Sequence, residues 1–365
     1  MDDGRVIKDS LYLYAPNKIA PVILAAVFFV SLIGHVYQCW YEYLDNRNII
    51  SHALTDNYSH YRSWKLIGLH PACAAFFVTG FVLREYGAFN YVYDKAASDA
   101  KIVLIIYIMS QVFIYICPPL LELSNYHVLS RVLAYVPSNS PIAPNKIFVI
   151  FGGLMSLVEV FNGLGVAYSS NPTGAQQATG RILVLVALAI QMFVIGSFFV
   201  ISTIFYIRCQ KSRASHTTVP TLTYVLWLSM GLILVRSIYR IVQYTGNTNR
   251  SDDSLQAEQN ITSLERCEWY FYVFEAAPML ANSLLWNIFS PGRFLPRSRN
   301  CWIDENGIEV TIPEPMAGQD GQSSSMTLLN TIMDIFTLGV WGHVVASRQE
   351  MPPLKVHDSP SPGAV

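Results

Sequence analysis

The sequence predicts an all-α integral membrane protein, a bundle of seven transmembrane helices with the N-terminus outside and the C-terminus in the cytoplasm. Three observations favour this fold. Hydrophobic residues make up 52% of the 365 residues and charged residues only 13%, about half the charged fraction of a typical soluble domain. Seven apolar stretches reach the length of about 20 residues that a helix needs to cross a bilayer. Basic residues collect beyond the fifth and seventh stretches, which sets the orientation.

The apolar stretches follow one another with short connections, so residues 19–290 are expected to form one membrane domain. They cover 19–40, 66–83, 102–121, 146–168, 182–207, 222–244 and 269–289. The third continues as a semi-apolar segment beyond Pro118 and Pro119. We interpret it as one long, kinked helix over 101–133, because prolines are tolerated in a spanning helix; a short break is the alternative. Residues 1–18 contain no signal-peptide core and are expected outside.

Charged residues between the stretches give the orientation. The segment 208–216 contains three basic residues and no acid, and the segment after 289 contains three arginines, so both are expected in the cytoplasm. The connection before the last stretch is acidic and carries glycosylation sequons at Asn249 and Asn260, which predicts a glycoprotein with this loop outside. Arg5, Lys8 and Lys18 argue mildly against this orientation, and a sequon at Asn57 falls in a loop expected inside.

Residues 291–365 are expected to form a cytoplasmic tail. Within it, 326–345 is apolar with a single acid. We interpret it as a helix that lies on the membrane surface or packs on the bundle, with an eighth span as the alternative. The Pro/Ser-rich end is expected to be disordered.

Several classes of function are disfavoured. A net charge of −1 offers no general attraction to nucleic acid. The six cysteines show no metal-binding spacing, so neither a metal site nor a disulfide framework is expected. No nucleotide-binding glycine loop and no catalytic motif is present. We therefore expect no cofactor and no enzymatic activity.

Four ionisable residues in the stretches fall at one depth. With a rise of about 1.5 Å per residue, Arg236, Arg240, Glu159 and Glu275 lie roughly 12, 6, 13 and 9 Å below the outer edge, and Glu268 lies at the rim. Such residues usually face the bundle interior or a cavity. Arg240 alone is near enough to the interface to snorkel. Two interpretations stay open: an ion-pair network that fixes helix packing, or a polar cavity that binds a lipid head group.

A second polar cluster is expected towards the cytoplasm. It comprises His35, Gln38, His70, Glu122, His127 and Arg131, at the ends of the first three stretches. Hydrogen-bonded interfacial residues are one interpretation. A proton relay is the other, because histidine titrates near neutral pH.

Longer motifs bring out a resemblance. These are GFVLR (80–84), PPLLELSNYHVLSR (118–131), ALAIQ (187–191), LILVRSIYRIVQYTG (232–246) and EWYFYVFEAAPMLANSLLWNIFSPGRFL (268–295). Over about residues 12–297 the chain resembles the fungal lipid-translocating exporter family, seven-span proteins linked to aminosterol resistance and to release of sphingoid long-chain bases. The resemblance also assigns Gln191 to the outer layer. The chain departs from the family pattern at three positions of this layer: the family is expected to have glutamine in place of Glu159, aspartate in place of Glu275 and glutamate in place of Gln243.

The resemblance implies a divergent member that moves amphiphilic, sphingoid-base-like or sterol-like lipids across the bilayer and contributes to stress or drug tolerance. The alternative is a seven-span receptor or sensor that couples an outer ligand to a cytosolic partner at 208–216 and the tail. Membrane lipids or amphiphilic small molecules are the expected partners in the first case. The plasma membrane is the expected location, with the endoplasmic reticulum or the vacuole as alternatives.

Overall fold

The structure is a computed structural model that describes residues 12, 16–52, 68–90, 100–142, 144–169, 176–211, 218–245, 267–295, 301–303 and 309–311. The chain divides into two compact units, Met1–Pro315 and Met316–Val365, and all described residues belong to the first. The predictions for the sequons at Asn249 and Asn260, for most of 208–216, for the helix 326–345 and for the end of the tail lie outside the described residues.

Each of the seven apolar stretches is helical over most of its length, and several helices run beyond the predicted limits. The helices are α1 (Ala20–His52), α3 (Leu69–Phe89), α4 (Ala100–Tyr135), α5 (Pro144–Ser169), α6 (Gln177–Lys211) and α7 (Thr218–Thr245). The last stretch is composed of α10 (Glu268–Phe271), a π-helical turn η2 (Tyr272–Ala276) and α11 (Ala277–Ile288). Short 3-10 turns lie at η1 (Pro137–Asn139) and η3 (Pro291–Arg293).

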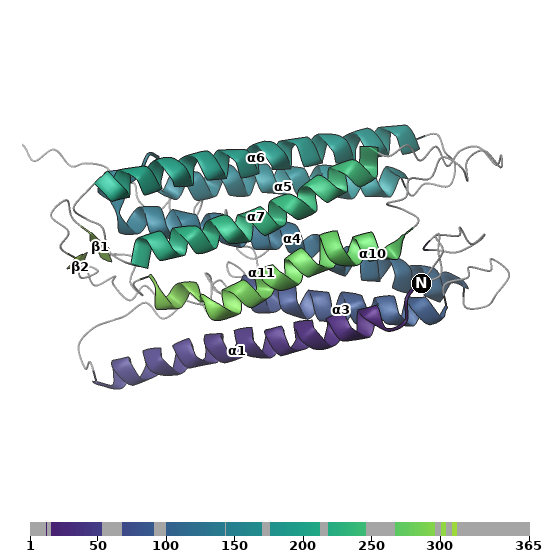
Figure 1. The fold of residues 1–365 in the computed structure, drawn as a ribbon, viewed down its shortest axis with the longest axis horizontal. Helices are drawn as coiled ribbons and strands as arrows, with labels where there is room; N and C mark the ends of the chain where they lie inside the picture. Colours follow the sequence, from purple (N-terminus) through teal and green to yellow (C-terminus); the bar gives the residue numbers. More distant parts are fainter. Residues whose placement is uncertain are drawn as a thin grey trace, which may run out of the picture. The chain divides into compact units, whose positions relative to one another are not determined.

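The helices lie side by side and successive helices run in opposite directions (Figure 1). Along the chain, α1 packs against α3, α3 against α4, α4 against α5, α5 against α6 and α6 against α7. The segment α11 packs against both α1 and α7, which brings the first and last helices together. The N-terminal end of α1 and α10 lie at one end of the bundle, and the small strands described below lie at the other (Figure 1).

Five helical segments of the described chain are long and apolar enough to cross a membrane. They are Ala20–Tyr41, Leu69–Phe89, Lys101–Tyr135, Ala178–Lys211 and Val219–Thr245. A shorter apolar helix, Ile150–Gly165, lies within α5. The last helical segment is divided by its π turn, so neither of its α-helical parts reaches the required length. The prediction of an all-helical membrane protein is thus confirmed at the level of its helices.

Large apolar side chains cover the outside of these helices. Exposed examples include Val30 on α1, Ile105 on α4, Phe193 on α6 and Ile238 on α7. A soluble protein rarely exposes a continuous apolar surface of this kind. The surface therefore fits a hydrocarbon surrounding.

The helix α4 contains Pro118 and Pro119 in its interior and still runs without interruption from Ala100 to Tyr135. The predicted single long helix is confirmed, and the alternative of a short break is wrong. Because the helix is continuous, it extends along the depth of the bundle and reaches both predicted polar regions.

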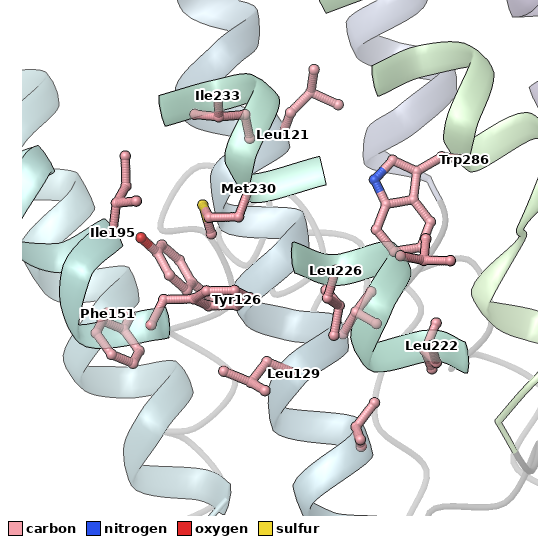
Figure 2. Close-up of a cluster of buried hydrophobic side chains, with 14 of the residues drawn as sticks. Leu121, Tyr126, Leu129, Phe151, Ile195, Leu222, Leu226, Met230, Ile233 and Trp286 are labelled. Atoms are coloured by element: carbon pink, nitrogen blue, oxygen red, sulfur yellow. The ribbon is translucent and has the colours of Figure 1, made fainter. Parts of the chain in front are cut away.

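The apolar core runs through the whole bundle and includes residues of α1 and α3, and the part shown in Figure 2 lies where α4, α5, α6, α7 and α11 meet. Tyr126 of α4 stacks on Phe151 of α5 with ring centroids 4.7 Å apart, and it meets Phe198 of α6 edge-on at 5.8 Å. Met230 of α7 and Trp286 of α11 are fully buried in the same cluster. Aromatic pairs of this kind contribute about 0.5–1.5 kcal/mol beyond their buried area.

A two-stranded antiparallel ribbon was not predicted. Strands β1 (Cys301–Ile303) and β2 (Glu309–Thr311) pair with Trp302 opposite Val310. The strand β1 packs against α4, and both Cys301 and Ile303 are buried. The start of the expected cytoplasmic tail is therefore attached to the bundle by apolar contacts, which departs from a purely α-helical fold.

Candidate functional site

A buried ion-pair group joins α7 to the last helical segment. Nε of Arg236 donates to Oε1 of Glu275 at 2.8 Å, and Nε of Arg240 lies 3.3 Å from Oε2 of the same carboxylate. The two arginines are one helical turn apart and so share a face of α7. All three side chains are buried. Arg236 thus has its carboxylate partner on the last helical segment, at the depth that residue counting gave for both side chains.

The backbone around Glu275 explains how its carboxylate reaches both arginines. Glu275 lies in the π turn η2, three residues before Pro278, the second residue of α11. Pro278 has no N–H to donate to the carbonyl four residues earlier. A wider π turn accommodates the missing bond, and such single turns are frequent at functional sites.

Arg240 is enclosed by side chains of the bundle and does not extend to the surface. Its guanidinium lies 3.6 Å from the centre of the Tyr115 ring on α4, and its Nη1 donates to Oε1 of Gln243 at 3.0 Å. Only 7% of Arg240 is exposed, so snorkelling to the interface is ruled out. The counter-charge comes from Glu275 on another helix, while the Gln243 amide supplies an additional acceptor.

A second ion pair occupies the same end of the bundle. Arg84 of α3 donates to Oε1 of Glu268 at 3.0 Å, and both side chains are buried. Glu268 also accepts from the Tyr272 hydroxyl at 2.8 Å and from the Asn17 backbone N–H at 2.6 Å. These contacts attach the segment before α1 to α3 and α10. Glu268 thus belongs to a pair of its own, separate from the Glu275 carboxylate.

Aromatic rings surround this second pair. The Arg84 guanidinium lies 4.3 Å from the centre of the Phe271 ring and 5.0 Å from that of Tyr12. Burial raises the pKa of the Tyr12 phenol, with the Arg84 charge acting in the opposite direction. Cation–π contacts of a desolvated arginine contribute about 2 kcal/mol, so Arg84 is held by more than its carboxylate.

Glu122 and Gln191 form a hydrogen bond with each other, although the sequence placed them in different polar groups. Nε2 of Gln191 on α6 donates to Oε2 of Glu122 on α4 at 2.7 Å, and the Tyr126 hydroxyl donates to Oε1. Glu122 was assigned to the inner cluster and Gln191 to the outer layer. That division is wrong, because α4 spans the depth of the bundle and brings Glu122 into electrostatic range of both Arg236 and Glu159.

Glu159 of α5 lies close enough to Arg236 for an electrostatic interaction. Within the described part of the chain it forms no ion pair, and its Oε1 has no hydrogen-bond partner. The predicted layer therefore contains Glu159, but the arginines bond Glu275 rather than this carboxylate.

Two of the three histidines in the predicted inner cluster meet in the bundle interior. The rings of His35 on α1 and His70 on α3 stack with centroids 5.5 Å apart. Nε2 of His35 lies 3.3 Å from the Ser283 hydroxyl on α11, and Nε2 of His70 lies 3.0 Å from the Ser124 hydroxyl on α4. The hydrogen-bonded interpretation of this pair is supported by these contacts.

Sequence reasoning missed the short polar residues that continue this network. The Ser229 hydroxyl on α7 donates to Asn282 at 2.6 Å and accepts from Trp286 Nε1 at 3.0 Å and from Asn125 Nδ2 at 2.9 Å. Interhelical hydrogen bonds from serine and asparagine are common in membrane bundles. Adjacent polar pairs in apolar helices, 124–125 and 282–283, were the signal that could have revealed them.

The remaining residues of the inner cluster are more dispersed. Gln38 donates through Nε2 to the Asn287 carbonyl of α11. His127 and Arg131 lie one and two turns beyond Ser124 on α4 and are half-buried. The predicted cluster thus separates into the histidine pair, the Glu122 group and this end of α4.

The described residues contain no group of three or more His, Cys, Asp or Glu side chains that could hold a metal ion. All six cysteines are free. Cys73 of α3 and Cys117 of α4 are near neighbours, each with its Sγ directed at the other's carbonyl, at 3.8 and 3.5 Å. The chemistry that the site offers is that of buried ion pairs and exchangeable hydrogen bonds.

Comparison with known proteins gives consistent matches. A family model described as RTA1 like protein matches residues 72–298. A lipid-translocating exporter-like protein RTA1 of Leptosphaeria maculans is 40% identical over 90% of this chain and 59% of its own length. A protein of the same name from Ajellomyces capsulatus is 26% identical over 65% of this chain and 71% of its own length. Protoporphyrin uptake protein 1 of Saccharomyces cerevisiae is 24% identical over 78% of this chain and 92% of its own length.

The chain covers less than two thirds of the Leptosphaeria relative, whose remaining length has no counterpart here. No solved structure matches the chain significantly. The matched region, 72–298, contains both ion-pair groups described above.

Proposed function

Because the chain belongs to the RTA1-like protein family, we propose that it moves amphiphilic lipids or sterol-like compounds across the bilayer, with sphingoid-base-like molecules as the substrate class. Such transport would contribute to stress or drug tolerance. The relatives' names refer to a lipid-translocating exporter and to protoporphyrin uptake. Lipids and porphyrins share the combination of an apolar body and a charged or polar group.

The observation that carries the proposal is the buried charge group inside an apolar bundle. An amphiphile that crosses a membrane needs polar contacts for its head group and apolar contacts for its tail. Arg236, Arg240 and Glu275 supply fixed charges on α7 and η2. The outer faces of the same helices are apolar. Charged groups at this depth are costly and commonly mark a substrate pathway.

The arginines bond Glu275 in this conformation, so a head group can reach them only by exchange. We assign the head-group contacts to Arg236, Arg240, Glu275 and Gln243. The ammonium group of a sphingoid base would take the place of one arginine at the Glu275 carboxylate, and its hydroxyl groups would accept hydrogen bonds from the arginine that is released. The Arg84–Glu268 pair would act at the rim of the same end.

The arrangement in the membrane is part of the proposal. The segments α5 and α10–η2–α11 would cross the bilayer together with the five longer apolar helices, which gives seven spans. The ion-pair end of the bundle would face the outside and the end with β1 and β2 the cytoplasm. The expected location is the plasma membrane.

Release of a labelled sphingoid base from cells tests the proposal. Cells that overexpress the chain should release the labelled base faster and survive a toxic amphiphile better than control cells. Arg236→Ala should remove both effects at equal surface expression. Unchanged release with the intact chain would contradict transport. A ligand-dependent change in binding of a cytosolic protein, without release, would favour a receptor instead.

A further inference from the structure

The buried acids of the bundle outnumber the arginines that face them. Glu122 and Glu159 lie in electrostatic range of Arg236, and Glu275 bonds both Arg236 and Arg240. With all five ionised, the group carries one net negative charge. An uncompensated charge is costly inside a membrane protein. The group therefore favours one additional positive charge.

The hydrogen-bond partners of Glu275 and Glu122 differ in whether they tolerate a proton on the carboxylate. Among the described residues, Glu275 accepts a hydrogen bond from Arg236 and forms an ion pair with Arg240, and both arginines are permanently charged and can only donate. These partners keep Glu275 ionised. Glu122 instead accepts from the Tyr126 hydroxyl and from the Gln191 amide. Hydroxyl and amide groups can both donate and accept, so the surroundings of Glu122 fit its ionised and its protonated form.

Gln191 supplies a second, independent observation. The residue is fully buried, its Nε2 donates to Glu122, and its Oε1 has no hydrogen-bond partner among the described residues. A buried acceptor without a donor is unfavourable. Once the amide turns by half a rotation, a protonated Glu122 can donate to the Gln191 oxygen, so the amide can bond either form of Glu122.

We propose that Glu122 takes up and releases one proton while the protein moves its amphiphile, so that transport is coupled to a proton gradient. This inference rests on the transport function proposed above. The proton comes from water and converts the carboxylate of Glu122 into a neutral carboxylic acid. It returns to water when the carboxylate forms again.

The groups around Glu122 determine what its protonation changes. They are Tyr126 on α4 itself, Gln191 on α6, Glu159 on α5 and Arg236 on α7. Ionised Glu122 attracts Arg236, which in this conformation is bonded to Glu275. Loss of the proton thus weakens the ion pair between Arg236 on α7 and Glu275 on η2, which we assign to head-group binding. Uptake of the proton by Glu122 strengthens this ion pair again.

Transport in liposomes tests the coupling. The full chain is reconstituted with a fluorescent sphingoid-base analogue in the membrane and a pH-sensitive dye inside. For the wild-type chain, an imposed pH gradient should change the transport rate, and transport should change the internal pH. Glu122→Gln should keep transport down the analogue's own gradient and lose both effects. Glu85→Gln, a carboxylate exchange on α3 away from this group, should keep both.

Infrared spectroscopy of the wild-type chain gives a reading that needs no transport. A band of a protonated carboxyl group should disappear as the pH is raised through neutrality, and that band should be absent from Glu122→Gln and present in Glu159→Gln. The inference would be overturned if the rate of wild-type transport did not depend on the pH gradient, or if the wild-type spectrum contained no titrating carboxyl band. Neither result would contradict transport itself. No wild-type transport at all would overturn the proposed function and the coupling with it.

Discussion

At the scale of single residues, Glu275 is the carboxylate on which the buried charge group depends. It serves two arginines of α7 at once, whereas each arginine has further contacts or neighbours. Gln243 and Tyr115 also hold Arg240, and Glu159 and Glu122 lie near Arg236. Loss of Glu275 should therefore leave the largest uncompensated charge.

Glu275→Gln should lower the free energy of unfolding more than Arg236→Gln or Arg240→Gln. Removing one partner of a buried ion pair costs about 3–5 kcal/mol, and Glu275→Gln leaves two cations without their carboxylate. Each arginine variant leaves Glu275 with the other arginine. Denaturant unfolding in detergent micelles, followed by circular dichroism, measures the ranking.

Lys211→Ala is the matched control, because Lys211 is an exposed charge at the end of α6. Its effect should stay within about 0.5 kcal/mol. A Glu275→Gln variant no less stable than this control would show that the ion pairs contribute nothing to the bundle.

The sequence could predict the Arg236–Glu275 pair because residue counting places both at one depth. Counting does not give the direction in which a side chain points around its helix, so the ring of Tyr115 under Arg240 and the Gln191–Glu122 bond were not foreseen. The contacts of Ser229 were missed for another reason. Short polar residues barely change the hydropathy of a stretch, although in the bundle they connect three helices.

At the scale of elements, close helix contacts depend on residues without a side chain. A Cβ added at Gly165 of α5 would lie 2.8 Å from the Gly180 carbonyl oxygen and 3.0 Å from the Val184 backbone nitrogen of α6. Backbone atoms cannot move aside as a flexible side chain can. The contact between α5 and α6 thus requires glycine at this position, as at other close helix crossings in membranes.

Gly165→Ala should destabilise the bundle by about 1–3 kcal/mol, the usual cost of overpacking. Gly163→Ala, two residues away, meets no atom within 4 Å. It should be neutral or slightly stabilising, because alanine favours a helix over glycine. Thermal unfolding of the two variants in the same detergent gives the comparison. Equal stability of both would contradict the close α5–α6 approach.

The lengths of the apolar stretches predicted where the helices lie, but not how far each helix extends. The predicted stretches are shorter than α1 and α6, because the polar residues at the ends of these helices give no hydropathy signal. The π turn of η2 depends on Pro278 and on the position of the Glu275 carboxylate beside the two arginines. The second factor is a contact between helices, which the local sequence does not show. The strands β1 and β2 are too short for a pattern to be recognised.

At the scale of the whole molecule, the proposed orientation rests on basic residues and sequons in the sequence. The C-terminal end of α7, α10 and the start of α1 lie at the same end of the bundle (Figure 1). If this end faces the outside, Asn249 and Asn260 are accessible to glycosylation. Asn57, in a loop that the sequence predicts on the inside, is then not accessible.

Replacing both Asn249 and Asn260 by glutamine should abolish the change in electrophoretic mobility that a glycosidase produces on the wild-type chain. Asn57→Gln is the internal control and should leave that change intact. A glycan that depends on Asn57 would reverse the proposed orientation.

Transport by the purified chain tests the central claim most directly. The full chain is reconstituted in liposomes, and the movement of a fluorescent sphingoid-base analogue between leaflets is followed with a quencher that cannot cross the membrane. The wild-type chain should accelerate this movement over protein-free liposomes, Arg236→Ala should abolish the acceleration, and Lys211→Ala should retain it. A wild-type rate equal to that of protein-free liposomes would contradict the account.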